Sequence, residues 1–133
     1  MSRLTLFLAR CIGLFTVLLV GGLMVRGSAI IEISAADGPV MLTYAIISLA
    51  MGVAMVIGHN VWSGGLLPVA VTLVGWLIFA KGLTLLLIAP EALSRAFTQL
   101  QYGEHYYLYL TPALLIGLYL TWAGFTLPGA SKF

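Results

Sequence analysis

Four long apolar stretches determine what this chain can fold into. They cover residues 4–25, 39–58, 68–89 and 106–127. A helix needs about 20 mostly apolar residues to cross the ~30 Å hydrocarbon core of a bilayer. A transmembrane β-strand would alternate apolar and polar residues instead, and runs such as 113–119 show no alternation. We therefore predict an all-α fold, a four-transmembrane-helix bundle in which residues 1–133 form a single membrane domain.

The composition agrees with a membrane protein. Only 8% of the residues are charged and 62% are hydrophobic, whereas soluble domains carry roughly 25% charged residues. This balance excludes a water-soluble globule, and it also excludes a disordered chain. The net charge of +2 is too small to imply a nucleic-acid partner. The predicted partner is the lipid bilayer, with a second copy or a larger membrane complex as further possibilities.

The connector before the last span has a pattern of its own. Leu93, Phe97 and Leu100 fall at helical spacing, while polar residues occupy other positions on the wheel. This pattern predicts a short amphipathic helix over about 91–103 that lies in the membrane interface. A linker that simply rests on the bundle is the alternative.

The basic residues indicate the orientation of the first span. Arg3 and Arg10 precede its apolar core and Arg26 follows it. Since Lys and Arg concentrate on the cytoplasmic side, we predict that both termini of the four-span chain are cytoplasmic. The four carboxylates would then all lie on the outer side. A cleaved signal peptide is the alternative for the first span, because residues 27–29 loosely resemble a cleavage site.

One ionisable residue lies well inside a span. Lys81 is nine residues before Pro90, and a charge at mid-membrane is costly and a functional candidate by default. Thr16 and Ser48 come to a similar depth in their own spans, and Tyr44 is somewhat shallower. We predict an intramembrane polar site made of these four residues, with Glu32 as a possible further member. The site is either a structural tether between helices or part of a ligand or proton site. The alternative is that Lys81 only snorkels to the interface and no such site exists.

The residue types needed for catalysis or metal binding are nearly absent. Cys11 is the only cysteine, and it most simply reads as a small apolar residue. His59 and His105 come at opposite ends of their spans, so they cannot share a metal ion or a haem. No nucleophile motif, phosphate-binding loop or intramembrane carboxylate pair occurs. We predict no catalytic residue, no metal and no cofactor, and the chain is not expected to be an enzyme.

Small residues predict where helices pack closely. Ala50, Ala54 and Gly58 recur every fourth residue in the second span, and Ala113, Gly117 and Thr121 do so in the fourth. Gly75 and Gly82 share one face of the third span. Such ridges let backbones approach closely in membranes. We expect them to pack inside the bundle, and a dimer interface is the alternative.

Residues 40–90 contain a set of short elements, His59-Asn60-Val61-Trp62, Gly75-Trp76, Lys81-Gly82 and Pro90. Together they resemble the pattern of a family of small four-span bacterial membrane proteins of unassigned function. It implies a four-span topology and a location in the bacterial inner membrane, and it implies no activity. We interpret His59, Asn60 and Trp62 as a candidate interfacial motif, in which Asn60 caps helix-end carbonyls and Trp62 anchors the chain.

Three functions fit the sequence. The first is a structural or accessory membrane subunit, or one that associates with itself, because soluble domains and catalytic groups are lacking. The second is a small transporter or channel that uses the Lys81 polar site. The third is a lipid- or quinone-binding membrane protein.

Overall fold

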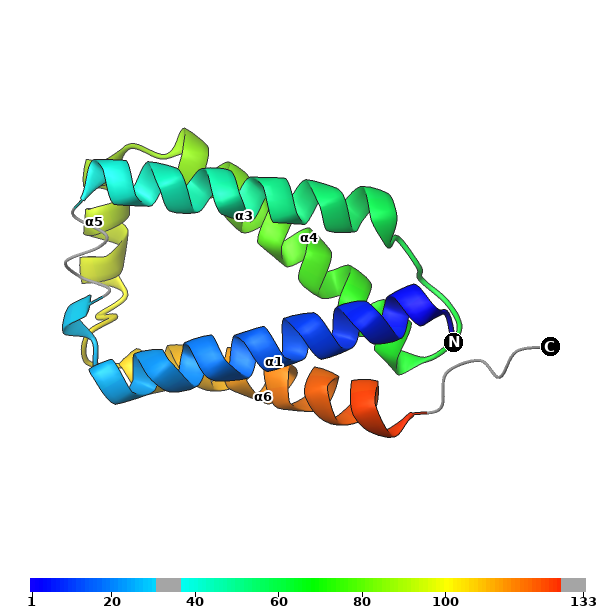
Figure 1. The fold of residues 1–133 in the computed structure, drawn as a ribbon. Helices are drawn as coiled ribbons and strands as arrows, with labels where there is room; N and C mark the ends of the chain where they lie inside the picture. Colours follow the sequence, from blue (N-terminus) through cyan, green and yellow to red (C-terminus); the bar gives the residue numbers. More distant parts are fainter. Residues whose placement is uncertain (31–36, 128–133) are drawn as a thin grey trace.

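The computed structural model describes residues 1–30 and 37–127, which form helices and no strand. The helices are α1 (Arg3–Arg26), α3 (Gly38–Gly58), α4 (Leu66–Leu87), α5 (Pro90–Gln99) and α6 (Tyr106–Thr126) (Figure 1). All of these except α5 are long and apolar enough to cross a membrane. The all-α fold class with four spanning helices is therefore confirmed, and each helix ends within two residues of its predicted span.

The helices begin and end where local chemistry permits it. The Ser2 hydroxyl accepts a hydrogen bond from the Thr5 backbone N–H (3.0 Å), and the Asp37 carboxylate accepts one from Val40 N–H (3.1 Å). Both are N-caps that satisfy donors left free in a first turn. Pro39 and Pro90 occupy first-turn positions, where their missing N–H costs nothing.

The four long helices form two antiparallel pairs, α1 with α6 and α3 with α4 (Figure 1). Glycine makes each pair tight. A Cβ atom added at Gly82 would collide with the backbone of Leu49, and one added at Gly13 would come within 2.5 Å of the Thr121 nitrogen. Lipid tails are as apolar as leucine, so close packing of this kind is what holds helices together in a membrane.

Side chains also tie α1 to α6 at both ends. The Arg10 Nε donates to the Gly124 carbonyl in the last turn of α6 (2.7 Å). At the other end the Tyr106 hydroxyl donates to the Leu23 carbonyl in the last turn of α1 (2.6 Å). Each helix of the pair thus provides a side-chain donor to a carbonyl in the last turn of the other helix, and the Leu23 carbonyl also accepts from the Gly27 N–H (3.0 Å).

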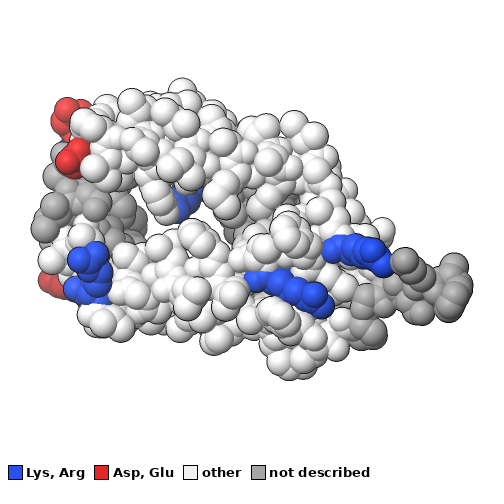
Figure 2. All heavy atoms as spheres, viewed as in Figure 1, with Lys and Arg blue, Asp and Glu red and all other residues white. Residues whose placement is uncertain are grey.

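The two pairs touch each other near one end only and diverge toward the other. They meet through α4, which contacts both α1 and α6 near the N-terminus of the chain, and Figure 2 shows the hollow that opens beyond this contact. A buried apolar cluster fills the meeting point and includes Ile12, Met55, Val71 and Leu120. We call the hollow the wedge, with this cluster as its floor.

Helix α5 spans the wide end of the wedge, from the end of α4 to the start of α6 (Figure 1). Leu93 and Phe97 are half-buried, whereas Leu100, predicted for the same face, is exposed. Phe97 packs edge-on against Tyr102, which stacks on Tyr109 with ring centroids 5.0 Å apart. The predicted amphipathic helix exists, and aromatic rings fasten it to the start of α6.

The small residues of α3 do not pack as expected. Ala50, Ala54 and Gly58 are all exposed, so the expectation that this ridge packs inside the bundle is wrong for the described chain. The face that α3 presents to α4 instead carries Ser48 and Gly52. The expectations for the other spans are confirmed, since Gly75, Gly82 and Gly117 are buried in the α3–α4 and α1–α6 contacts.

We predict that Gly82→Ala destabilises the protein by about 1–3 kcal/mol, the usual cost of overpacking a site whose neighbour cannot move. The added methyl group would collide with the Leu49 backbone. The measurement is the free energy of unfolding in mixed micelles. Gly22→Ala is the matched control, because a Cβ there meets nothing within 4 Å. Equal stability of the two variants would contradict the packing described for α3 and α4.

Candidate functional site

The intramembrane lysine has a partner on the neighbouring helix. The Lys81 Nζ of α4 donates a hydrogen bond to the Tyr44 hydroxyl of α3 (2.6 Å) and lies 4.4 Å from the centroid of the Tyr44 ring. Both residues come six positions from the helix ends at the wide side, which is roughly 9 Å at 1.5 Å per residue. The two side chains therefore form a polar pair below the membrane edge.

The helical registers of α3 and α4 direct this pair toward the wedge. Val74 and Ile78 pack on the cluster that forms the floor, and Lys81 follows them at helical spacing. On α3, Tyr44 lies eleven residues before Met55, another floor residue, and so on the same face. Beyond the floor, these two faces continue into the space between the pairs.

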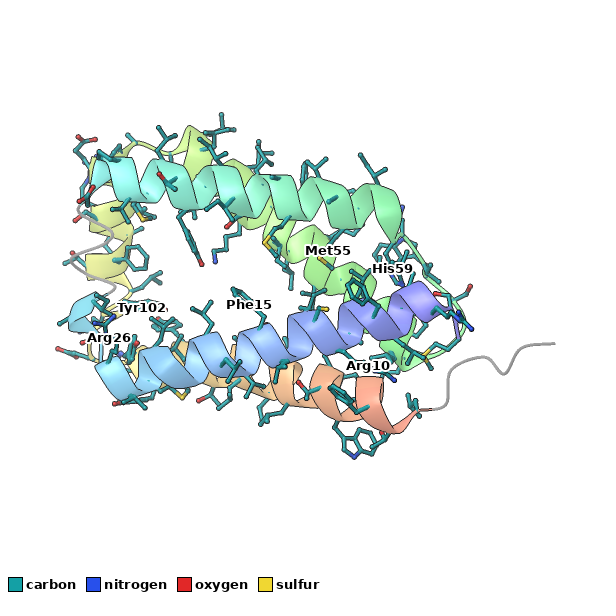
Figure 3. All side chains as sticks on the ribbon, viewed as in Figure 1. Arg10, Phe15, Arg26, Met55, His59 and Tyr102 are labelled. Carbon is teal, nitrogen blue, oxygen red and sulfur yellow. The ribbon has the colours of Figure 1, made fainter. Side chains whose placement is uncertain are left out.

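Other aromatic side chains border the same space. Phe15 points from α1 toward the gap between the pairs (Figure 3), and its side chain is 57% exposed. Tyr102 closes the wide end. Burial raises the pKa of its phenol above the ordinary value of 10.0, and the neighbouring phenols of Tyr106, Tyr44 and Tyr109 raise it further.

Within residues 1–30 and 37–127, Lys81 has no compensating charge in this space. No carboxylate of the described residues lies within ion-pair distance of its ammonium group, and Glu32 falls outside those residues. An ammonium group has three N–H donors, and Tyr44 accepts one of them. A cation surrounded by hydrocarbon is costly until charge or hydrogen bonds compensate it. The two other donors have no acceptor in the part of the chain that the structure describes.

The two other residues of the predicted polar site lie elsewhere. Thr16 packs against Gly117, where an added Cβ would come within 3.0 Å of the threonine side chain, so Thr16 belongs to the α1–α6 contact. Ser48 is buried beside Gly82 in the α3–α4 contact. The structure thus joins Lys81 with Tyr44, and it gives Thr16 and Ser48 packing positions.

A second polar cluster lies where the pairs meet, and we call Thr5, His59 and Thr72 the junction. His59 ends α3 and is 3% exposed (Figure 3). Its Nε2 lies 2.9 Å from the Thr5 hydroxyl of α1, and its Nδ1 lies 3.2 Å from the Thr72 hydroxyl of α4. One imidazole ring therefore connects three helices. Sequence reasoning placed His59 at the interface and missed both threonines.

The remaining residues of the interfacial motif form an exposed unit beside the junction. The Asn60 side-chain oxygen accepts hydrogen bonds from the indole N–H of Trp62 (2.7 Å) and of Trp76 (3.4 Å). In the described chain these bonds go to indoles and not to helix-end carbonyls, which corrects the role expected for Asn60. Two of the sequence elements that carried the family resemblance, His59-Asn60-Val61-Trp62 and Gly75-Trp76, thus meet through the Asn60 side chain.

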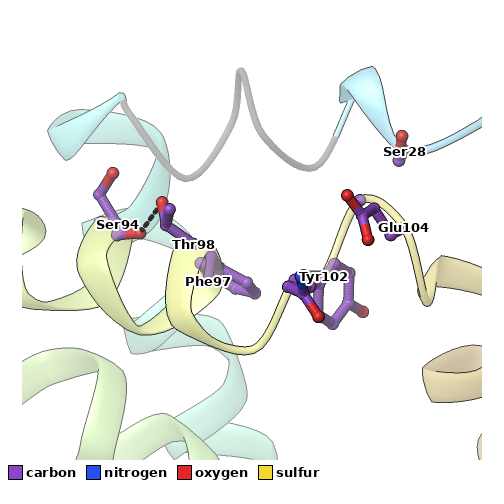
Figure 4. Close-up of a pocket in the computed structure, with 8 residues that line it drawn as sticks. Ser28, Ser94, Phe97, Thr98, Tyr102 and Glu104 are labelled. Atoms are coloured by element: carbon purple, nitrogen blue, oxygen red, sulfur yellow. Dashed lines mark hydrogen bonds between the residues drawn. The ribbon is translucent and has the colours of Figure 1, made fainter.

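The structure offers little to hold a metal ion or a cofactor. No three His, Cys, Asp or Glu side chains of residues 1–30 and 37–127 converge on a common point. A surface pocket of about 710 Å³ lies at the wide end (Figure 4). Its lining provides hydroxyl, amide and carboxylate groups and no basic side chain: Ser28, Ser94, Phe97, Thr98, Gln101, Tyr102, Gly103 and Glu104. No nucleophile–base pair occurs among these residues.

The fold and these clusters define the class of the protein, a polytopic α-helical membrane protein with a polar pair inside its spans. Comparison with known proteins adds no narrower group. No family model, no curated protein and no solved structure matches the chain.

We predict that Thr72→Val lowers the free energy of unfolding by about 1–3 kcal/mol, the cost of leaving a buried polar group unsatisfied. The Thr72 hydroxyl serves His59 and also accepts from the Val61 N–H (3.0 Å). Thr84→Val is the matched control on the same helix, since that exposed hydroxyl bonds only to the Ala80 carbonyl. If both variants unfold alike in mixed micelles, the junction makes no special contribution to stability.

Proposed function

We propose that this protein is an integral membrane binding protein that takes an anionic amphiphile into the wedge, with Lys81 and Tyr44 as the headgroup site. The observation that carries the proposal is the Lys81–Tyr44 pair, a cation beside a single phenol in a space open to lipid. A carboxylate or phosphate would supply the missing charge. Charge-assisted hydrogen bonds of this kind are about twice as strong as neutral ones.

The wall chemistry suits an amphiphile better than a small ion. The exposed Phe15 ring and the apolar floor around Met55 provide a surface for an acyl or isoprenoid chain. Because the wedge opens sideways, a lipid-like molecule reaches Lys81 from the bilayer without crossing water. A hydrated ion would first have to lose its water shell in hydrocarbon.

The charge distribution supports an orientation for this site. The described charges of the wide end are three carboxylates and two guanidinium groups, Asp37, Glu91, Glu104, Arg26 and Arg95, whereas those of the narrow end are Arg3 and Arg10 (Figure 2). Only the narrow end therefore has an excess of positive charge among the described residues. Basic residues favour the cytoplasmic side. We therefore propose cytoplasmic termini in a bacterial inner membrane, with Lys81 in the half of the bilayer that faces outward.

The test is a binding titration of the purified protein with probes that share an oleoyl chain. Oleate and dioleoyl phosphatidylglycerol are anionic, and oleyl alcohol is neutral. We expect at least one anionic probe to bind about tenfold more tightly than the alcohol, since a hydrogen bond to a charged group contributes about 1.5–3 kcal/mol. Preference for oleate indicates a free fatty acid, and preference for the phospholipid indicates a phosphate headgroup.

Variants assign the effect to the site. Lys81→Met should abolish the preference for an anion, and Tyr44→Phe should weaken it. Arg95→Met is the matched control, because it removes an exposed cation of α5, outside the spans. Equal binding of oleate, phosphatidylglycerol and oleyl alcohol by the unmodified protein would contradict the proposal.

A second candidate function, a self-associating or accessory membrane subunit, is favoured by the α3 ridge that stays exposed. Ala50, Ala54 and Gly58 present small residues to lipid, as helix–helix contacts in membranes usually do. We expect a dimer in native mass spectrometry that Ala54→Leu dissociates. Val53→Leu, which enlarges a neighbouring exposed position, should leave it intact. A monomeric unmodified protein would contradict this candidate.

A further inference from the structure

We infer that His59 is a positioning residue, and that its bonds to Thr5 and Thr72 fix the angle between the two helical pairs and so the width of the wedge. The inference rests on the proposed function only in giving that width a purpose. The angle itself is a property of the free protein.

The junction is the polar connection at the place where the pairs meet. In the described chain, α4 makes the substantial contacts between the pairs, with α1 and with α6, while α3 packs on α4. The rest of the contact is an apolar cluster that includes Leu6, Leu67 and Leu120. Apolar contacts are not directional, so they permit the pairs to rotate. Hydrogen bonds require a defined geometry, and those of His59 therefore select one angle.

One set of donor and acceptor roles satisfies every group of the junction. The Thr72 oxygen accepts from the Val61 N–H (3.0 Å), and its proton has carbonyl acceptors in Val61 (2.9 Å) and Pro68 (3.0 Å). Its second lone pair is then free to accept from the Nδ1–H of His59. This leaves the Nε2 of a neutral imidazole as an acceptor for the Thr5 hydroxyl.

The chain of bonds ends at the N-cap of α1. The Ser2 hydroxyl accepts from the Thr5 backbone N–H (3.0 Å) and is 2.7 Å from the Thr5 hydroxyl, to which it donates. Every described donor of the network thus has an acceptor, and no buried side-chain N or O atom of the described residues lacks a partner. A directional network of this kind connects the first turn of α1 to α4 through the end of α3.

The helices amplify small rotations at the junction. Val25 lies twenty residues beyond Thr5 on α1, which is about 30 Å at 1.5 Å per residue. A rotation of about 10° at the junction would therefore displace the wide end by about 5 Å. At Phe15, ten residues beyond Thr5, the displacement is about half as large. Such changes are comparable to the width of an acyl chain, so the angle decides whether both walls touch one ligand.

The experiment measures the angle in the full-length protein without ligand. Cys11, the exposed free cysteine, is replaced by serine, and spin labels are attached at Val25→Cys on α1 and Val40→Cys on α3, both exposed. Pulsed electron–electron double resonance in lipid nanodiscs then gives the distance between the two labels across the wide end. A second label pair, Leu42→Cys and Leu83→Cys, reports the distance inside the α3–α4 pair.

We expect His59→Ala to shift the distance distribution across the wide end by about 5 Å, or to broaden it by that amount. The distance inside the α3–α4 pair should stay unchanged. Thr5→Val should act in the same way, whereas Thr5→Ser retains the hydroxyl and should restore the original distribution. His105→Ala is the matched control, because it removes the other histidine, an exposed side chain at the N-cap position of α6 that makes no capping hydrogen bond.

Two results would overturn the inference. An unchanged distance across the wide end in His59→Ala and Thr5→Val would show that packing alone sets the angle. A simultaneous change inside the α3–α4 pair would show a general loss of structure instead of rotation about the junction. The proposed function fails separately, because Lys81→Met tests ligand binding and leaves the junction residues in place.

Discussion

Close packing of backbones is the interaction on which the rest of this structure depends. In hydrocarbon the hydrophobic effect does not bring helices together, because lipid tails are as apolar as leucine side chains. Gly52 and Gly82 let α3 and α4 approach until each backbone touches the other helix, and Gly13 and Gly117 do the same for α1 and α6. Contacts of this quality occur within the pairs and are few between them. The wedge follows from that difference.

Polar side chains add hydrogen bonds to the contacts that glycine permits. Within the α1–α6 pair, Arg10 and Tyr106 satisfy helix-end carbonyls of the partner helix. Between the pairs, where glycine contacts are lacking, His59 provides a directional connection to Thr5 and Thr72. Each of these groups is satisfied by a neutral partner or a carbonyl. Lys81 differs, because its only described hydrogen bond leaves two N–H donors without an acceptor. Packing therefore accounts for most polar groups of the spans and does not account for this one.

Much of the fold could be predicted from the sequence, because the length of an apolar run is set by the thickness of the bilayer. The spans, the short helix from Pro90 and the buried faces of Gly75 and Gly82 are examples. The rotation of α3 about its axis could not be predicted. This helix is apolar on every side, so its lipid-facing and protein-facing residues share one chemistry, and Ala54 looked as suitable for packing as Gly52. The junction escaped prediction for another reason, since Thr5 and Thr72 have no unusual spacing and gain meaning only when His59 is placed between them.

The wedge cannot be an empty space in a bilayer, and this consideration connects the two polar clusters. Lipid tails or a ligand must occupy it, and the choice depends on the electrostatics of its wall. A tail contacts Phe15 and the apolar floor well but leaves the Lys81 ammonium uncompensated, whereas an amphiphile with an anionic head satisfies both surfaces. An amphiphile gains both contacts only if it reaches both walls of the wedge at once. The distance between the walls must therefore be fixed. A small rotation at the narrow end is amplified along about 30 Å of helix. A rigid connection at the narrow end therefore fixes the distance between the walls with few bonds. In the function proposed above, the junction sets the width of the site and the Lys81–Tyr44 pair selects its occupant.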